Sequence, residues 1–395
     1  MNLHQRRPLL RRLFVLALLP LAVAGCRRQH FPKFPADYRE FAYVTNGGSN
    51  TVTVLDLVNL RLDRVLQVGA EPTGVTANLK KNEIYVVNSG GSGNGSVSVI
   101  DAEKNQVVAT IPVHRKPYFI DIDAEGKRGY VANSGSNSVS VIDLALRREI
   151  GVVGVGEAPG KAKISPDGGS LVVTNRMSGS VSVVDPVKMA VRSVFSGCPQ
   201  ATDVVILPDS SKAFVACSGG HQVMALGLSN PTDHKDTLLA FLDVGKTPVH
   251  LALKPDGGEI FVSNFDSDSV SEIATGTNEV GGAYLVGAHP SHGIVSADNS
   301  TLWTSDFNAD SISAYSIDDG KLIKPSVRVG GGPDALAFSD NGFLLLAADA
   351  SSGDVSVVRT QSYTSKGAIR VGSLFTMLPA GKSPNAIAVK SYRVK

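Results

Sequence analysis

The sequence predicts an all-β fold made of one repeated unit, and three observations support this prediction. Residues 41–56 have the sequence FAYVTNGGSNTVTVLD. Its apolar run, Gly/Ser/Asn turn and polar/apolar alternation are typical of a β-hairpin. Related tetrads recur at steps of 42 to 47 residues, beginning at Tyr85, Tyr130, Val172, Phe214, Phe261, Trp303 and Leu346. Helical periodicity is absent, so the constant period favours a β-propeller with one four-stranded blade per repeat.

The first 25 residues are predicted to be an export signal and to lie outside the fold. A basic start (Arg6, Arg7, Arg11 and Arg12) precedes the apolar segment 13–24, which is too short to span a bilayer. The signal ends in Val-Ala-Gly-Cys, which resembles a bacterial lipoprotein lipobox and implies lipidation of Cys26. Arg27 then favours the outer membrane by resemblance to Gram-negative sorting signals. The polar residues 26–40 are predicted to be a tether.

Counting strands favours eight blades, in a propeller domain that covers residues 41–395. Eight innermost strands are predicted, beginning at Pro72, Pro117, Pro159, Ala201, Pro248, Pro290, Pro333 and Pro384. The domain begins on a second strand and ends on an innermost one, so its two ends should share one blade and close the ring. Seven blades is the alternative, because the last unit is irregular. Either residues 368–372 or residues 374–377 would be its fourth strand.

The repeat resembles the YVTN family of β-propeller repeats. The resemblance rests on the tetrads at Tyr43, Tyr85 and Tyr130, each followed by a segment of the type Ser-Val-Ser-Val-Ile-Asp, and it covers residues 41–391. It implies an exported or surface protein without established chemistry. We expect the recurring Asn of the tetrads to cap the hairpin bends. The recurring Asp56, Asp101, Asp143 and Asp185 should accept hydrogen bonds from backbone N–H groups of the next turn.

Composition and motifs exclude several classes of protein. The net charge is +2 and no basic stripe occurs, so nucleic acid is not a predicted partner. The chain has 3 cysteines, and their spacing fits neither haem attachment nor a zinc ribbon. It also has no Gly-x-Ser-x-Gly nucleophile motif and no phosphate-binding glycine loop with its lysine.

Candidate site residues come from positions where the repeats differ. Aligning the starts of the innermost strands, which line the central channel, places five polar residues at one height: Lys161, Asp203, His250, His292 and Asp334. The turns between second and third strands add Arg176, His221, Phe265, Asp266, Phe307 and Asp310. Together they predict a ligand site at one channel mouth, and a polar channel lining without a ligand is the alternative. His250, His292, Asp203 and Asp334 could hold a divalent metal; no other cofactor is predicted.

The function favoured by these features is non-catalytic. We expect a monomeric, lipid-anchored protein of the bacterial cell envelope that faces the periplasm or the cell surface. One propeller face would bind an envelope protein or a glycan. The alternative is an enzyme or cofactor carrier, similar to propeller lactonases, lyases or haem-d1 proteins, that uses His250 and His292.

Cys198 and Cys217 belong to the same predicted blade. Cys198 precedes an innermost strand and Cys217 ends the second strand, where register places it opposite Thr202 or Asp203. A disulfide forms only if the crossover folds back. Two independent buried thiols are the equally open alternative.

Overall fold

The computed structural model describes residues 32–229, 235–363 and 369–394 of the chain. Two compact units are distinguished, Met1–Ala36 and Asp37–Lys395. The second unit is the propeller. The predicted signal segment and Cys26 lie outside the described residues. Within the described ranges, no helix is long and apolar enough to cross a membrane.

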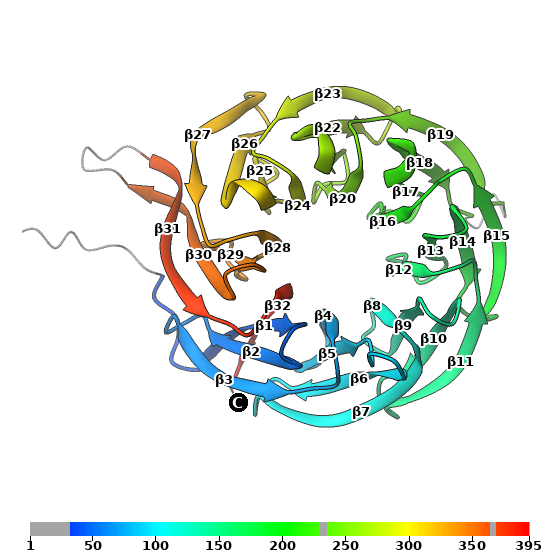
Figure 1. Cartoon of the computed structure of the whole chain (residues 1–395), viewed down its shortest axis with the longest axis horizontal. Coiled ribbons are helices and arrows are strands. Elements are labelled where there is room, and N and C mark those ends of the chain that lie inside the picture. The colour runs from blue at the N-terminus through cyan, green and yellow to red at the C-terminus, as the bar shows by residue number, and fades with distance from the viewer. Residues whose placement is uncertain (1–31, 230–234, 364–368, 395) are drawn as a thin grey trace, which may run out of the picture. The chain divides into compact units, whose positions relative to one another are not determined.

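The propeller is a ring of eight four-stranded antiparallel sheets, which confirms the predicted fold class and blade number (Figure 1). We call the sheets blades A to H. Blade A contains β1 (Tyr38–Asn46), β2 (Thr51–Asp56), β3 (Arg61–Gln67) and β32 (Pro384–Arg393). Blade B contains β4 (Pro72–Ala77), β5 (Glu83–Asn88), β6 (Asn94–Asp101) and β7 (Gln106–Arg115). Blade C contains β8 (Pro117–Ile122), β9 (Arg128–Asn133), β10 (Ser138–Asp143) and β11 (Arg148–Gly154).

In the remaining blades, as in blades B and C, the four strands follow chain order from the channel outward. Blade D contains β12 (Pro159–Ile164), β13 (Leu171–Asn175), β14 (Ser180–Asp185) and β15 (Ala190–Ser196). Blade E contains β16 (Ala201–Ile206), β17 (Lys212–Cys217), β18 (Gln222–Gly227) and β19 (Thr237–Asp243), with η1 (Ser218–Gly220). Blade F contains β20 (Pro248–Leu253), β21 (Glu259–Asn264), β22 (Ser269–Ala274) and β23 (Glu279–Leu285), with η2 (Phe265–Ser267). Blade G contains β24 (Pro290–Val295), β25 (Thr301–Asp306), β26 (Ser311–Ser316) and β27 (Lys321–Arg328), with η3 (Phe307–Ala309). Blade H contains β28 (Pro333–Phe338), β29 (Leu344–Asp349), β30 (Asp354–Tyr363) and β31 (Ile369–Pro379).

Blade A closes the ring with strands from both ends of the domain, as predicted. Strand β1 pairs with β32 from Tyr38 opposite Arg393 to Asn46 opposite Pro384. The strand thus begins three residues before the predicted domain boundary. Strand β31 covers residues 369–372 and 374–377, so the two segments that the sequence left as alternatives belong to one strand; residue 368 lies outside the described residues. The Asp340 N–H of blade H also donates to Glu40 Oε1 in β1 at 2.6 Å. This hydrogen bond links blade H to blade A, in addition to the strand pairing within blade A.

In blades A, B, C, D and F the recurring Asn stabilises the hairpin between the second and third strands. Asn46 Nδ2 donates to Thr51 and Thr53 Oγ1, both at 3.0 Å. Asn88, Asn133, Asn175 and Asn264 make the equivalent contacts to serines. In blades A, B, D and F a glycine three residues before the innermost strand packs on this Asn, and a Cβ atom at Gly69 would lie 2.7 Å from the Asn88 side chain. Blade C carries His114 at the glycine position. The Asn and the Gly therefore form one unit of packing.

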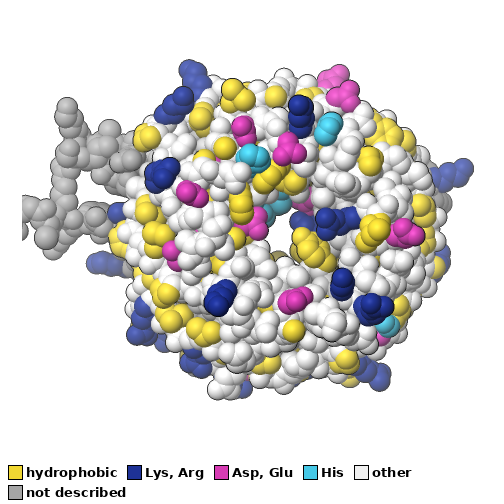
Figure 2. Space-filling view, viewed as in Figure 1, with side chains coloured by type: hydrophobic (Ala, Val, Ile, Leu, Met, Phe, Trp, Pro, Cys, Tyr) yellow, Lys and Arg dark blue, Asp and Glu magenta, His cyan; other side chains and the backbone are white. Residues whose placement is uncertain are grey.

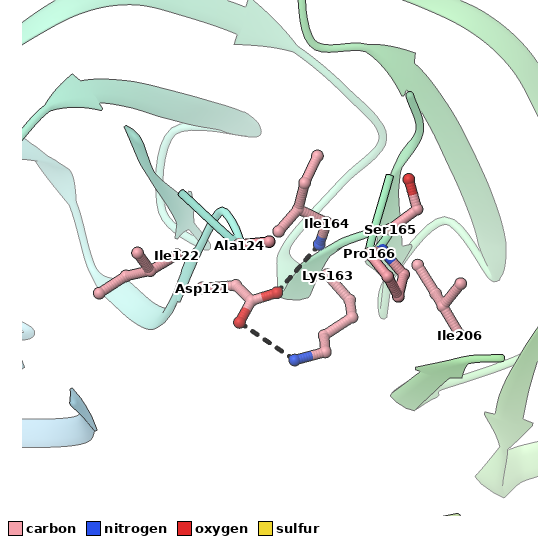
Figure 3. Close-up of a pocket in the computed structure, with 8 residues that line it drawn as sticks. All are labelled: Asp121, Ile122, Ala124, Lys163, Ile164, Ser165, Pro166 and Ile206. Atoms are coloured by element: carbon pink, nitrogen blue, oxygen red, sulfur yellow. Dashed lines mark hydrogen bonds and ion pairs between the residues drawn. The ribbon is translucent and has the colours of Figure 1, made fainter. Parts of the chain in front are cut away.

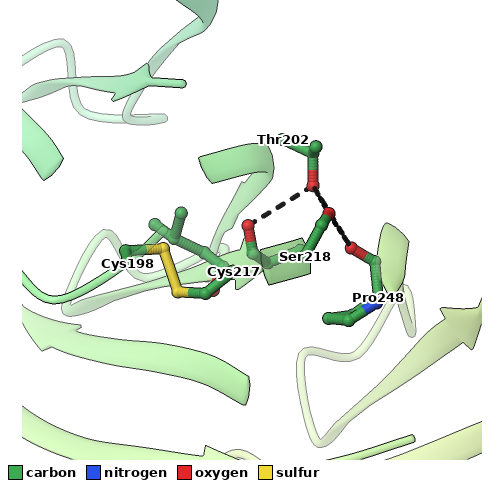
Figure 4. Close-up of a disulfide and its surroundings, with 7 residues drawn as sticks. Cys198, Thr202, Cys217, Ser218 and Pro248 are labelled. Carbon is green, nitrogen blue, oxygen red and sulfur yellow. Dashed lines mark hydrogen bonds between the residues drawn. A yellow bond between two sulfur atoms is a disulfide. The ribbon is translucent and has the colours of Figure 1, made fainter. Parts of the chain in front are cut away.

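Blade E replaces this unit with a disulfide (Figure 4). Cys217 stands at the Asn position and Cys198 at the Gly position, with their Cα atoms 4.7 Å apart. The third strand carries Gln222 and Met224 where the other blades have hydroxyl acceptors, so an Asn here would lack its partners. Both cysteines are fully buried.

Blades G and H replace the Asn with Asp306 and Asp349, which are also fully buried. Burial raises the pKa of Asp306 to about 6, although Ser313 and Ser311 donate to its carboxylate. Burial and the neighbouring Asp354 raise the pKa of Asp349 to about 8. Each carboxyl group thus favours its protonated form in the folded protein, and ionisation opposes folding. The cost is absent below the unfolded-state pKa of about 4 and grows as pH rises toward the folded-state value.

We expect Asp349→Asn to stabilise the protein, by about 2 kcal/mol at pH 8. Its amide can donate to Ser356 and Asp354, as the Asn does in the other blades. The gain should shrink toward pH 4, because the wild-type carboxyl group is then protonated in both states. Thermal unfolding from pH 4 to pH 8 measures this, with the exposed Asp319→Asn as control. An equal gain at every pH would show that ionisation of Asp349 is not the cause.

Candidate ligand site at the upper channel mouth

The site lies on the face where the innermost strands begin, which we call the upper face. Each innermost strand starts with a β-bulge: Ala201 pairs with Cys217 and Asp203 with Ala216, so Thr202 is the extra residue. The same irregularity precedes His250 in blade F and His292 in blade G. The bulge therefore sets the third residue of each strand at one height around the channel.

Four third residues in consecutive blades form a continuous chain of contacts. The Lys161 ammonium donates to Asp203 Oδ1 at 2.6 Å. The other oxygen, Asp203 Oδ2, accepts the Leu251 N–H at 2.9 Å and lies 3.6 Å from His250 Nε2. The rings of His250 and His292 then stack with their centroids 3.7 Å apart. The structure thus brings together Lys161, Asp203, His250 and His292 from blades D to G.

Among these four contacting residues, Lys161 and Asp203 carry the charge. Burial would raise the pKa of Asp203, but Lys161, His250 and the hydrogen bonds outweigh it and lower that pKa to about 2. Burial lowers the pKa of His250 to about 4 against the opposing effect of Asp203. Burial, His250 and Lys161 lower the pKa of His292 well below its ordinary value. Both imidazoles are therefore neutral at pH 7, beside an ion pair.

The two imidazoles differ in what remains available to a ligand. His250 Nδ1 accepts the Gly293 N–H at 3.2 Å, which leaves the proton on Nε2, facing Asp203. Both nitrogens of His250 are thus engaged in holding blades E, F and G together. Among the described residues, the His292 ring makes no hydrogen bond. Its nitrogens are also absent from the set of side-chain polar atoms that are buried without a hydrogen-bond partner, so they are accessible. His292 is the member of the chain that can contact a ligand.

The remaining blades leave the other side of the mouth open. At the third position, blades H, A and B carry the small residues Ala335, Ala386 and Gly74. Blade C carries Phe119, whose ring lies 5.3 Å from Lys161 Nζ. Figure 2 shows the central opening, with basic, acidic and histidine side chains at its border. A ligand that contacts His292 would have space above the three small residues.

Asp334 does not lie at the predicted height. Register pairs Ala335 with Ala348, so Asp334 is the extra residue of its bulge and corresponds to Thr202 and Ser291. The predicted set of four metal ligands is therefore not assembled. No group of three or more His, Cys, Asp or Glu suited to a metal occurs in the described part of the chain. Burial raises the pKa of Asp334, which a hydrogen bond from Ser291 opposes.

The turn residues predicted for the site mainly connect neighbouring blades. His221 Nδ1 accepts the Thr247 N–H at 3.2 Å, and Asp266 Oδ2 accepts the Thr247 hydroxyl at 2.5 Å. Asp310 Oδ1 accepts the Gly332 N–H at 3.0 Å. The Phe265 ring packs edge-on against the His289 ring, with their centroids 4.6 Å apart. The remaining two differ in exposure: Arg176 is exposed and Phe307 is partly buried beside blade H. None of them joins the contacts of the four channel residues.

The opposite mouth contains a second polar pair that sequence reasoning missed. Lys163 Nζ donates to Asp121 Oδ1 at 3.1 Å, and the Ile164 N–H donates to Asp121 Oδ2 at 3.0 Å (Figure 3). A cavity of about 190 Å³ lies beside the pair, and Ile122 and Ile206 contribute to its largely apolar lining. The sequence alignment could have identified this pair. Asp121 and Lys163 each lie two positions after the third residue of their strand, and side chains two positions apart in a strand point to the same side.

Comparison with known proteins gives a family and a set of similar folds. The model of the YNCE-like beta-propeller family matches residues 129–365. No curated protein matches the chain. Dihydro-heme d1 dehydrogenase NirN in complex with DHE is similar with a TM-score of 0.70 and 15% identity, covering 93% of this chain and 78% of that chain.

Two further solved structures extend the comparison. AztD from Citrobacter koseri has a TM-score of 0.65 and 12% identity, covering 91% of this chain and 99% of that chain. The periplasmic gluconolactonase PpgL from Pseudomonas aeruginosa has a TM-score of 0.60 and 19% identity, covering 89% and 98%. At these identities the likeness shows the fold alone.

Proposed function

The chain belongs to the YNCE-like β-propeller family, and we propose that it acts as a binding protein of the cell envelope. Proteins that share a fold differ in function through their sites, so the proposal is argued from the site. It holds a ligand or a group of a partner molecule at the upper channel mouth. One observation carries the proposal: Lys161, Asp203 and His250 satisfy one another, while His292 is left with free nitrogens beside an open half of the channel.

Binding is favoured over catalysis by the same contacts. General base catalysis needs a base whose partner orients it toward the reacting proton. His250 has that kind of partner in Asp203, but its Nδ1 already accepts a backbone hydrogen bond. His292 has free nitrogens, but its ring is oriented by stacking alone. No nucleophile is placed beside either imidazole in the described contacts.

Native mass spectrometry of protein purified from its own host tests the binding proposal. We expect the wild type to carry a small molecule or a partner fragment, and His292→Ala to lose it. His221→Ala is the matched control, since that imidazole lies on the same face but is engaged with Thr247. A wild type that carries nothing, or a bound species that His292→Ala retains, would contradict the proposal.

A cofactor carrier is the second candidate, and the neutral imidazole of His292 favours it. Unprotonated imidazole nitrogen is a common ligand of haem iron, and the similar structure of NirN was solved with DHE bound. In such a site His292 would coordinate the metal, and Ala335, Ala386 and Gly74 would leave room for the ring. The absorption spectrum of the same preparation distinguishes the two candidates. A stoichiometric chromophore selects the carrier, and a transparent ligand selects the first proposal.

We also propose that the protein is a lipoprotein anchored through Cys26. The basic start, the short apolar segment and the lipobox-like Val-Ala-Gly-Cys support this. Replacing Cys26 with Ser is expected to leave a folded propeller that no longer sediments with carbonate-washed membranes, because acyl chains supply the attachment that survives the wash. Membrane fractionation after a carbonate wash is the measurement. Continued sedimentation of the variant would show that another anchor exists.

A further inference from the structure

The chain enters the propeller on the face opposite the candidate site, which we call the lower face. The Val394 N–H donates to the Asp37 carbonyl oxygen at 2.8 Å, and the Leu57 N–H of the β2–β3 turn donates to Glu40 at 3.0 Å. The end of β32 also touches the lower turns of blade B, since Lys390 Nζ donates to the Asn78 carbonyl oxygen at 2.8 Å. Asp37, the first residue of the propeller unit, therefore lies at the lower face.

Four exposed apolar side chains lie on this face in four consecutive blades. Val394 in blade A is 49% exposed, Leu79 in blade B 84%, Leu146 in blade C 60% and Val187 in blade D 76%. The last three are at turn tips, where no neighbouring strand covers them. We call this set the apolar arc.

Hydrogen bonds between lower turns join the blades of the apolar arc. Asn78 Nδ2 in blade B donates to the Gly126 carbonyl oxygen in blade C at 3.0 Å. Arg128 in blade C donates to the Pro186 carbonyl oxygen in blade D at 3.3 Å. Blades B, C and D, which carry three of the four side chains of the apolar arc, are therefore linked to one another at the lower face.

The balance of charge differs between the two halves of the lower face. Exposed cations flank the apolar tips, with Lys80 next to Leu79, Arg147 and Arg148 next to Leu146, and Lys188 next to Val187. The described lower turns of blades E to H expose no large apolar side chain. They expose carboxylates, among them Asp209, Asp256, Asp298 and Asp319. The lower turns of blades B to D also expose three carboxylates, Glu103, Glu125 and Asp167, but more cations than carboxylates. Apolar tips with adjacent cations suit an anionic lipid surface, which repels the acidic half.

We infer that the apolar arc rests on the anionic bilayer to which the tether is attached, so that the upper mouth faces away from the membrane. The inference rests on the proposed lipid anchor. The tether has 11 residues between Cys26 and Asp37 if the latter is counted, and an extended chain covers about 3.3–3.6 Å per residue. It can reach no more than about 40 Å. A tether of this length allows contact between blades A to D and the lipid headgroups.

Blade D supplies a matched pair of probe positions. Val187 on the lower face is 76% exposed and Met177 on the upper face is 77% exposed. Val187→Cys and Met177→Cys are each labelled with a fluorophore in the lipidated full-length protein, since Cys198 and Cys217 are paired and buried. The labelled proteins are placed in vesicles of phosphatidylethanolamine and phosphatidylglycerol that contain spin-labelled lipid. We expect several-fold stronger quenching at position 187. Equal quenching, or stronger quenching at 177, would overturn the orientation.

Flotation of the same vesicles separates the two proposals. Protein that fails to float shows that the anchor proposal is wrong, whereas floating protein without differential quenching shows that the orientation is wrong. A second measurement uses Cys26→Ser protein and the same lipids without a spin label. Leu79→Asp with Val187→Asp should weaken its vesicle binding about tenfold, because an apolar contact is replaced by a repelled charge. Met177→Asp should leave it unchanged, and equal weakening by Met177→Asp would contradict the apolar arc.

Discussion

Replacing Asp203 with Ala is expected to lower the free energy of unfolding by about 3 kcal/mol, because the substitution leaves a buried charge without its partner. The Asp203 side chain is 3% exposed and that of Lys161 is 24% exposed. The same carboxylate accepts the Leu251 N–H from the next blade, which would also lose its acceptor. The variant therefore weakens the contact between blades D, E and F together.

A double-mutant cycle isolates this effect. Lys161→Met in the Asp203→Ala background should recover part of the loss, since no unpaired ammonium then remains. Asp209→Ala, an exposed carboxylate of the same blade, should change stability by less than about 0.5 kcal/mol. Urea denaturation of the four proteins gives the coupling energy. Additive effects of the two substitutions would contradict the ion pair.

The pH dependence of Asp203 gives an independent signature. Its folded pKa is lowered to about 2, so its contribution is present above the unfolded pKa of about 4 and is lost as pH falls toward 2. His250 acts at higher pH: its folded pKa of about 4 lies below the unfolded value of about 6.5, and stability falls across that interval on acidification. Unfolding of Asp203→Ala should keep the second decline and lose the first.

Removing the Cys198–Cys217 disulfide is expected to cost about 3 kcal/mol. The cysteines are 19 residues apart, and cross-linking a loop of this size restricts the unfolded chain by roughly that amount. Cys198→Ser with Cys217→Ser should unfold at lower denaturant than the wild type. The wild type should approach the variant only when reductant is present in denaturant, because both cysteines are fully buried in the folded state.

Thiol counting provides the control for this prediction. Alkylation of denatured, unreduced wild type should modify neither cysteine, and reduction should expose both. Two modified thiols without reductant would contradict the disulfide. Equal stability of wild type and double variant under oxidising conditions would contradict the expected cost.

The sequence predicts the fold well because the blade is a local pattern that recurs. Strand alternation and the Gly/Ser/Asn turns define each hairpin, and the split of strands between the two ends specifies blade A. The recurring Asp of the third strands in blades A to D also behaves as predicted. Each of Asp56, Asp101, Asp143 and Asp185 accepts two backbone N–H groups of the next turn. Each of these features depends on residues close together in the chain.

The prediction of which channel residues lie close together depended on alignment between repeats, and it holds only where the alignment was correct. Lys161, Asp203, His250 and His292 lie together as their shared position predicts. Asp334 was placed one residue out of register, because it is the second residue counted from Pro333, as Thr202 and Ser291 are in their strands, and Ala335 is the third. The disulfide could have been predicted from the same alignment, since Cys198 and Cys217 occupy the Gly and Asn positions that pack together in other blades.

The shared blade A has a consequence for the time course of biosynthesis. Strand β1 ends at Asn46 and its partner β32 begins at Pro384, so 384 minus 46, or 338, residues separate them along the chain. Ribosomes add about 5–20 residues per second, so roughly 20 to 70 s pass between the appearance of the two strands. Throughout that interval the apolar sequence Phe-Ala-Tyr-Val-Thr of β1 has an unpaired edge, the kind of surface on which chains aggregate. We therefore expect newly made chains to aggregate more readily before β32 has been made than after it.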